Sequence, residues 1–558
     1  MRNENERAHE VRPVHRSDIA YSGSNADHKW AGLLVLALGL SLIVVDGTIV
    51  GVSMPVISKD LSLNIADAQW VNSLYNVVFA ALLLTAGRLG DRFGRRKLFI
   101  VGLAIFIVAS AAASMAHTIG FLVAARAVQG VGAAAILPST ISNLNATFRG
   151  RERAIAFGIW GATMSAAAAV GPLLGGWLTT LFTWPWIFLV NVPTGLLIIV
   201  LAFLVVPETT GNTSSGLDGV GTLLSSLGFG LIVFGVIEGQ SLGWIRPISE
   251  FRVLGLTWSM SAVLSAAGCA IVCGVLVSIV FLAWEQRRAD GEGKLLDLQL
   301  FRIASFSWGS LALVVINAAE FVLIFLLPLY LVNVLGLSTM GAGWVLASLA
   351  LGSILAGASV RHLSRVMSSA TIVLVGAVLE LASVAFTAAI LSPTTRSGTI
   401  AIVMAVYGAG VGLTSAQLTS LVLIGVPPED SGMASATQST LRQLGSAVGS
   451  AVGGTILAAS IAQTAPSRLM AIRGITQPVA EKITRATVDS VGGVISGLRQ
   501  PSAAAHYGPD ARQMADVLAQ SFSMSTSAGL WLAAGMLACG LAASVVLWRI
   551  ARNIDETK

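Results

Sequence analysis

The stretch Gly87-Arg88-Leu89-Gly90-Asp91-Arg92-Phe93-Gly94-Arg95-Arg96-Lys97 decides how the chain folds. Its glycines permit a tight turn, and its basic residues surround a single acid, Asp91. Long apolar stretches flank it on both sides, so we expect a short loop between two membrane-spanning helices. A loop that only fixed the orientation of the chain by its positive charges would require neither the aspartate nor the spaced glycines. The pattern therefore indicates a loop whose acid binds a partner that changes with conformation.

The composition supports a membrane protein of many spans. Hydrophobic residues make up 55% of the 558 residues and charged residues only 11%, whereas soluble domains carry about 25% charge. The net charge of +6 is spread over short loops, with no basic patch on a soluble module, which argues against a nucleic-acid-binding protein. No P-loop motif and no catalytic constellation occurs, so we expect neither an enzyme nor an energy-hydrolysing pump. We predict no metal site and no cofactor.

Apolar segments recur at a length near the roughly 20 residues that cross a bilayer. The predicted spans are 30–54, 70–87, 98–116, 119–141, 154–180, 184–206, 218–239, 258–283, 306–335, 342–360, 370–391, 399–426, 431–459 and 525–548. Fourteen spans place both termini on one side. With the N-terminus inside, inner segments carry 22 of the 34 lysines and arginines and the short outer loops carry four. The positive-inside rule therefore predicts that both termini are cytoplasmic.

The spacing of the spans predicts the domain organisation. Removing the pair at 218–239 and 258–283 leaves six helices before it and six after it, an arrangement found in secondary transporters. The predicted domains are a disordered cytoplasmic tail 1–29, an N-terminal six-helix bundle 30–206, a linker 207–284 with two extra spans, a cytoplasmic loop 285–305, a C-terminal six-helix bundle 306–548 and a cytoplasmic tail 549–558. The long loop 460–524 has helical spacing at 477–500 and 510–521, and we expect it to be external and partly ordered.

Three further motifs accompany the loop at Gly87–Lys97. They are Asp46-Gly47-Thr48-Ile49-Val50-Gly51-Val52-Ser53-Met54-Pro55, Arg126-Ala127-Val128-Gln129-Gly130-Val131-Gly132 and Gly171-Pro172-Leu173-Leu174-Gly175-Gly176. The loop resembles the signature of the major facilitator superfamily, and the four blocks in this order resemble the fourteen-helix drug:proton antiporters of that superfamily. The last block is similar to the antiporter motif of exporters and comprises Gly171, Pro172, Gly175 and Gly176. The first motif departs from the family pattern at Gly47, Gly51 and Ser53.

The resemblance implies an all-α fold of two six-helix bundles with two extra central helices, working by alternating access. It also implies a gate at the inner surface, in which Asp91 contacts the other half of the protein. The block Pro427-Pro428-Glu429-Asp430-Ser431-Gly432 precedes the thirteenth span, and the positive end of that helix is the expected partner. The predicted gating residues are Asp91, Arg92, Arg95, Arg96 and Asp430.

A few charged residues lie inside predicted spans, where each is unfavourable by about 2.5–3.5 kcal/mol on the insertion scale. Asp46 and Arg126 lie at similar depths, about 12 Å from the outer ends of their helices at 1.5 Å per residue. Facing one cavity, they can compensate each other, and the carboxylate can exchange a proton as the cavity opens. Glu320 occupies the corresponding helix of the second bundle. We predict proton coupling by Asp46, Arg126 and Glu320. The alternatives are a static structural pair for Asp46 and Arg126 and a helix-packing polar group for Glu320. For Glu380 we expect an ion pair with Arg442, with a role in proton coupling as the less favoured alternative.

Aromatic and polar residues within the spans are candidates for an amphipathic or cationic substrate. They are Tyr75, Asn76, Trp160, Trp308, Phe321, Phe325, Tyr330 and Gln417. Ordinary helix packing is the alternative for each of them, and they do not identify a compound.

The sequence thus predicts a multi-pass transporter in a bacterial cell membrane, acting as a monomer. It would exchange protons for hydrophobic, cationic drugs. Two alternatives stay open: export of an endogenous metabolite such as an antibiotic, siderophore or amino acid, and transport of a lipid or envelope precursor.

Overall fold

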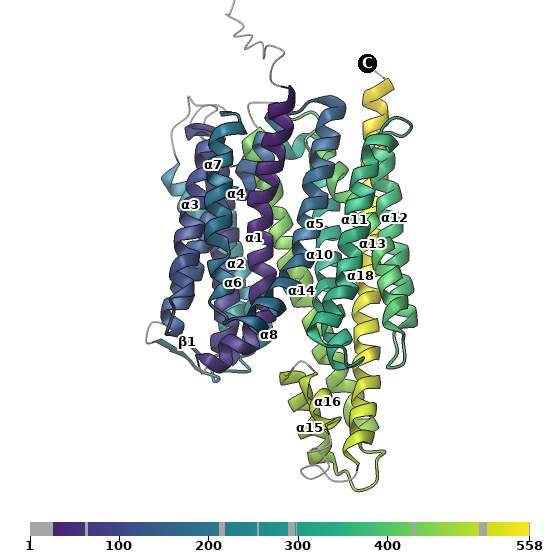
Figure 1. Cartoon of the computed structure of the whole chain (residues 1–558). Helices are drawn as coiled ribbons and strands as arrows, with labels where there is room; N and C mark the ends of the chain where they lie inside the picture. The colour runs from purple at the N-terminus through teal and green to yellow at the C-terminus, as the bar shows by residue number, and fades with distance from the viewer. Residues whose placement is uncertain are drawn as a thin grey trace, which may run out of the picture.

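The computed structural model describes residues 26–61, 65–210, 218–253, 256–287, 296, 298–427, 431–490, 492–500 and 510–556. Long helices stand side by side and make up nearly all of this part of the chain (Figure 1). Twelve of the described helices are long and apolar enough to cross a membrane. The prediction of an all-helical membrane protein is therefore confirmed.

The N-terminal helices surround one core of buried aromatic and aliphatic side chains. They are α1 (Ala26–Asp60), α2 (Ile65–Phe93), α3 (Arg95–Ser114), α4 (Ile119–Thr147), α5 (Gly150–Leu181), α6 (Trp186–Leu189) and α7 (Asn191–Val205). Within this group α3 packs on α4 and α7, α2 on α4, and α1 on α5. Residues 1–25 of the predicted tail lie outside the described residues, and its last residues already belong to α1.

A helix pair follows, formed by α8 (Gly219–Leu242) and α9 (Ala266–Arg287), which pack on each other, while α8 also contacts α2. Between them β1 (Phe251–Val253) and β2 (Leu256–Trp258) pair antiparallel. The predicted span 258–283 is thus wrong at its start, because the chain there forms a strand and a turn. The Trp258 indole donates to the Leu264 carbonyl at 2.9 Å and secures this turn.

The C-terminal helices enclose the largest hydrophobic core of the molecule. They are η1 (Leu298–Arg302), α10 (Ala304–Asn333), α11 (Thr339–Leu363), α12 (Ser369–Ile390), α13 (Ser397–Val422), α14 (Ser431–Leu469), α15 (Gln477–Asp489), α16 (Gly493–Leu498) and α18 (Ala511–Glu556). The first residue of α1 and the last residue of α18 lie at the same end of the bundle (Figure 1).

The count of fourteen spans remains a prediction. Helices α2 and α5 occupy the positions of the predicted spans 70–87 and 154–180 and contain 29 and 32 residues, but they are not among the twelve. The predicted span 184–206 is divided into α6 and α7. Pro193 lies in the first turn of α7, where its missing N–H is tolerated. The predicted domain boundaries likewise stay predictions.

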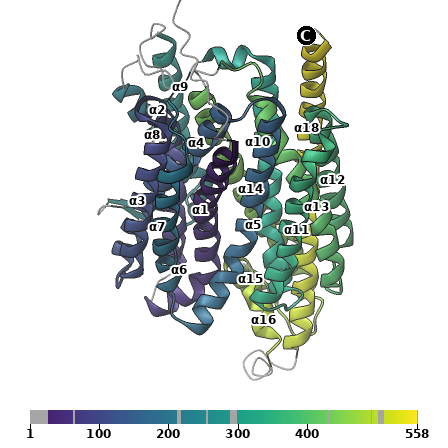
Figure 2. The same ribbon diagram turned by 45° about the horizontal axis from the view of Figure 1, so that its top comes forward.

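Helices α14 and α18 run past the other helices at the end opposite the C-terminus, and α15 and α16 pack beside them there (Figures 1 and 2). Helix α14 continues to Leu469, beyond the predicted span end at 459. The guanidinium of Arg499 donates to the Val334 carbonyl at 2.6 Å and so ties this region to the end of α10. Residues 501–509 lie outside the described residues.

Close packing of α1 on α5 depends on glycines of the fifth helix. A Cβ atom at Gly171 would overlap the Thr48 side chain, and one at Gly175 would come within 3.0 Å of the Ile49 carbonyl oxygen. At Gly176 no atom lies within 4 Å of such a Cβ. Two glycines of the predicted antiporter motif thus lie in a helix contact and one faces open space.

We predict that Gly171→Ala lowers the stability of the purified protein, because the added methyl group forces α1 and α5 apart. Overpacking of this kind is unfavourable by about 1–3 kcal/mol. The matched control Gly176→Ala should be neutral or stabilising by up to about 1 kcal/mol, as alanine favours a helix over glycine. Thermal unfolding in detergent measures both variants, and equal melting temperatures would contradict the contact.

Candidate functional site

The centre of the N-terminal bundle holds a buried cluster of charged and polar side chains. Arg126 donates from Nη1 to Asp46 Oδ2 at 2.5 Å and to Gln129 Oε1 at 2.9 Å. Gln129 in turn donates from Nε2 to Asp46 Oδ1 at 3.2 Å. Asp46, Arg126 and Gln129 are all fully buried. The two charges that the sequence predicted to compensate each other are therefore in direct contact.

Helix α7 contributes a further donor to the same carboxylate. Asn191 donates from Nδ2 to Asp46 Oδ1 at 2.9 Å and to the Ser110 hydroxyl oxygen of α3 at 3.3 Å. Because α7 begins at Asn191, the interruption after α6 brings this side chain to the cluster. Sequence reasoning missed Asn191 and Ser110. A polar residue two positions before Pro193, within an apolar run, was the signal available.

Aromatic rings and a backbone carbonyl complete the surroundings of the arginine. Its guanidinium carbon lies 4.2 Å from the centroid of the Tyr75 ring and 5.9 Å from that of Phe188. Its Nε donates to the Val71 carbonyl at 3.2 Å. Arg126 therefore keeps favourable contacts with a ring and a carbonyl apart from Asp46, so loss of the carboxylate charge would not leave it isolated. Tyr75, predicted to bind substrate, lies in this cluster.

A second buried ion pair lies at the corner between α2 and α3. Arg95 donates to Asp91 Oδ1 from Nη2 at 2.8 Å and from Nε at 3.0 Å, and both side chains are 1% exposed. Arg95 also donates to the Ser142 carbonyl of α4 at 3.3 Å. The corner turns at Gly94, whose φ of +108° is readily adopted only by glycine.

The same corner is bound to the chain that follows α7. The backbone N–H of Arg96 donates to Glu208 Oε1 at 3.0 Å, and its guanidinium donates to the Val206 carbonyl at 3.2 Å. Arg92, the remaining predicted gating residue of this corner, is half-buried. The signature loop is thus an ordered corner between α2 and α3 that side-chain hydrogen bonds hold in place.

Asp91 also faces the C-terminal half. The backbone amide of Met433, in the first turn of α14, interacts with its carboxylate. The positive end of a helix stabilises a carboxylate, so the expected partner of Asp91 lies beside it in this conformation. Asp430 lies outside the described residues, and the gating role of these groups stays a prediction.

The predicted acid of the C-terminal bundle lies near a cation and a second acid. Glu320 of α10 is half-buried and interacts electrostatically with Arg442 of α14. Glu380 of α12, for which the sequence suggested Arg442, interacts with Glu320. Among the described residues, no interaction of Glu380 with Arg442 appears. The guanidinium carbon of Arg442 lies 5.8 Å from the ring centroid of Trp160, across the interface between the two bundles.

The remaining substrate candidates are dispersed. Tyr330 is fully buried, and its hydroxyl donates to the Ser392 carbonyl at 2.5 Å, which favours a packing role. Trp308 is 41% exposed. Three others, Asn76, Phe321 and Phe325, are half-buried, whereas Gln417 is fully buried. Their part in substrate binding stays a prediction. The side chain of Pro172 lies outside what the structure describes.

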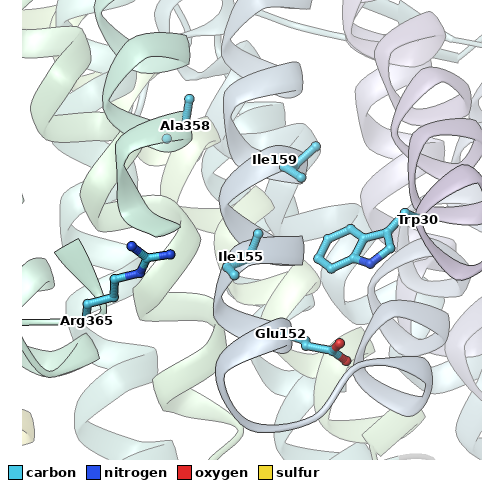
Figure 3. A pocket seen from close by; sticks show the side chains of 7 residues that line it. Trp30, Glu152, Ile155, Ile159, Ala358 and Arg365 are labelled. Carbon is cyan, nitrogen blue, oxygen red and sulfur yellow. The ribbon is translucent and has the colours of Figure 1, made fainter. Parts of the chain in front are cut away.

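A cavity of about 750 Å³ lies between the two halves, near the end where α1 begins. Helices α1, α5 and α11 and the turn after α11 line it with Trp30, Glu152, Ile155, Ile159, Gly357, Ala358 and Arg365. In Figure 3 the Trp30 ring lies on one side of α5 and the Arg365 guanidinium on the other. Lys29 donates to both Glu152 oxygens at 2.8 Å at its rim. None of the predicted substrate residues lines this cavity.

Comparison with known proteins identifies the family. The family model described as Major Facilitator Superfamily matches residues 36–450. The chain belongs to this superfamily. It is therefore a transporter of the multi-pass membrane type and not an enzyme, and the resemblance carried by the four sequence motifs is confirmed.

Individual relatives agree with this assignment. The multidrug resistance protein Stp of Mycobacterium tuberculosis is 30% identical over 471 residues, covering 83% of each chain. The tetracenomycin C resistance and export protein of Streptomyces glaucescens is 29% identical over 440 residues, covering 79% of this chain and 78% of that protein. The crystal structure of the human organic anion transporter MFSD10 (TETRAN) aligns with a TM-score of 0.52 at 13% identity, over 91% of this chain and 99% of that one. That likeness shows a shared fold.

We predict that Asn191→Leu destabilises the protein by about 1–3 kcal/mol, because a buried carboxylate loses a hydrogen bond that nothing replaces. Thr194→Val on the same helix is the control, since the exposed Thr194 hydroxyl donates to the carbonyl of Val190, the residue just before α7. Thermal unfolding in detergent compares the two variants. A melting temperature of Asn191→Leu equal to that of the control would show that the donor is dispensable.

We also predict that Asp91→Asn impairs transport while membrane insertion stays intact. The asparagine keeps the shape of the side chain, but it loses the ion pair with Arg95 and the attraction to the start of α14. Substrate transport by membrane vesicles, normalised to the amount of inserted protein, measures the effect. Transport at the wild-type rate would remove the gating role.

Proposed function

We propose that this chain is a proton-coupled antiporter of fourteen spans that exports hydrophobic, cationic compounds by alternating access. The observation that carries the proposal is the fully buried Asp46, held by donors from α4 and α7. The relative named a multidrug resistance protein supports the class of cargo.

The geometry suggests how a proton changes the N-terminal bundle. While ionised, Asp46 is bound by Arg126, Gln129 and Asn191, which join α1, α4 and α7. A proton on Asp46 removes its charge and weakens its attraction for Arg126. The arginine keeps its contacts with Tyr75 and the Val71 carbonyl, so the three helices become free to separate. Because the carboxyl is closed off from water in this conformation, proton exchange requires such an opening.

Contacts between the halves support the rocking step of this proposal. At one end Asp91 of α2 faces the first turn of α14, and Arg153 of α5 donates to the Ser420 carbonyl of α13 at 2.8 Å. A central contact joins Arg442 to Trp160. These polar contacts join halves whose main hydrophobic cores are separate, which is the construction expected of halves that move as rigid bodies.

A second candidate is export of an endogenous secondary metabolite, which the relative named a tetracenomycin C resistance and export protein favours. Export of an antibiotic made by the same cell uses the same exchange of protons for cargo and differs only in the compound. Counterflow assays in proteoliposomes, comparing cationic dyes with extracts of native metabolites, separate the two. We further propose that the protein resides in a bacterial cell membrane.

We predict that Asp46→Asn abolishes uphill export of a cationic dye driven by a proton gradient in proteoliposomes. The amide cannot release a proton, so the coupling reaction is lost even where downhill exchange persists. Asp60→Asn is the control on the same helix, because Asp60 lies at its end, away from the cluster, and accepts a hydrogen bond from the Trp184 indole at 2.6 Å. Undiminished uphill export by Asp46→Asn, or export insensitive to an uncoupler, would refute the proposed function.

A further inference from the structure

The cavity of Figure 3 lies on a face of α5 that points away from the centre of the molecule. Ile155 and Ile159 line it from that face. On the other side of the same helix, Arg153 donates to the Ser420 carbonyl of α13 at 2.8 Å, and Trp160 is 1% exposed. Because a helix turns by about 100° per residue, the two isoleucines face away from this contact with the other half. The cavity is therefore separate from the centre, where transport would take place.

Helix α11 continues the cavity onto a surface of exposed apolar side chains. Leu351, Ile354 and Leu355 are 57%, 40% and 62% exposed. Ala358, which lines the cavity and is also exposed, lies about one turn further along the same face of the helix. A large exposed apolar surface on a membrane-spanning helix faces lipid. The cavity thus opens onto the hydrocarbon of the membrane, and lipid molecules have direct access to it.

The cavity is polar at one end and apolar at the other. Glu152 lies in the first turn of α5 and Arg365 just after α11, so both lie at the end predicted to be cytoplasmic. Ile159 lies about 10 Å deeper along α5, at 1.5 Å per residue. Figure 3 shows this order, with Ile159 and Ala358 toward one end and the two charged residues toward the other. A phospholipid of the inner leaflet has the same order of groups, with its headgroup at the interface and its chains further in.

The charges at the polar end favour a ligand with one negative charge. Lys29 donates to both carboxylate oxygens of Glu152 at 2.8 Å, which neutralises that acid. Within the part of the chain that the structure describes, the side chain of Arg365 forms no hydrogen bond or ion pair. Its guanidinium points toward α5 (Figure 3). Two cations and one acid leave one positive charge, and a guanidinium can bind a phosphate through two parallel hydrogen bonds.

The wall that α1 contributes is held in place by contacts within the protein. The ring of Trp30 lies 5.0 Å from that of Phe148, and the Lys29 ammonium lies 6.0 Å from the same phenyl ring. A wall that is already ordered lowers the entropy lost on binding. The volume of about 750 Å³ is within the range of ligand sites. A tryptophan at this depth is also typical of the membrane interface.

We propose that this cavity binds one phospholipid of the inner leaflet that carries a single net negative charge, such as phosphatidylglycerol. Arg365 binds the phosphate, and an acyl chain lies along Trp30, Ile155 and Ile159. The lipid contacts α5 of one half and α11 of the other. It therefore stabilises conformations in which these two helices lie together at this end. The site acts independently of the proposed exchange of protons for cargo.

Native mass spectrometry of the delipidated protein in detergent tests the headgroup contact. We expect the wild type to bind one phosphatidylglycerol and Arg365→Gln to bind it about tenfold more weakly, because a charged hydrogen-bonded contact is lost. Arg302→Gln is the control, since Arg302 is also an exposed arginine but does not line the cavity. Phosphatidylethanolamine, which carries no net charge, should bind the wild type more weakly. Equal affinities for the two lipids, or in the two variants, would overturn the proposal.

A second pair of variants tests the chain contact. Ala358→Phe fills the apolar end without changing the charge and should also weaken phosphatidylglycerol binding. Ala538→Phe, at an exposed position of α18, is its control. Soluble glycerol phosphate offers the same phosphate without a chain and should not displace the lipid. Displacement by glycerol phosphate, or undiminished binding to Ala358→Phe, would show that the site recognises a free phosphate and would overturn the lipid assignment.

Thermal unfolding separates this inference from the proposed function. Phosphatidylglycerol should raise the melting temperature of the wild type and of Asp46→Asn, but not that of Arg365→Gln, because a ligand stabilises the state that binds it. A wild type without this rise overturns the lipid site and leaves the proposed antiport standing. A rise that persists in Asp46→Asn supports the lipid site whether or not that variant exports dye. If Arg365→Gln is already unstable without lipid, Arg365→Lys keeps the charge and should show a reduced rise, and a full rise would overturn the bidentate contact.

Discussion

The contact between Asp46 and Arg126 is the interaction on which the N-terminal half depends. A lone charge inside a bilayer is strongly unfavourable, whereas a pair with further hydrogen bonds can be accommodated. The cluster meets this condition with donors from α4 and α7 around one carboxylate of α1. Because these buried groups bind one another away from water, the cluster fixes how the three helices are arranged. The hydrophobic cores on either side fill the space that this arrangement leaves.

The two halves solve the problem of buried charge differently. The N-terminal half pairs one acid with one base and satisfies both. The C-terminal half has two acids, Glu320 and Glu380, and one base, Arg442, which interacts with Glu320. This asymmetry suits a transporter whose proposed cargo is a cation, because a substrate charge and a proton can serve as alternative partners for the same carboxylates.

Much of this was predictable from the sequence, because membrane insertion leaves a strong pattern. The apolar lengths predicted the helices, and the depths of Asp46 and Arg126 predicted that the two could meet. The strand pair at 251–258 was missed because strands of three residues are too short to show an alternating pattern within a predicted outer loop. Asn191 was missed because its role depends on a helix break that orients it toward α1. The neighbours of Glu380 could not be assigned either, since sequence does not tell which of two acids faces Arg442.

Helix α18 contains 46 residues, which at 1.5 Å each span about 69 Å, more than twice the ~30 Å of a bilayer core. Together with the elongated α14 it extends past the other helices and holds α15 and α16 away from the interface between the two halves. A rotation displaces each atom in proportion to its distance from the rotation axis. A small tilt of the C-terminal bundle would therefore move α15 and α16 farther than the helices near the interface. An antibody fragment bound to α15 and α16 would therefore restrict this motion and slow transport without entering the transport path.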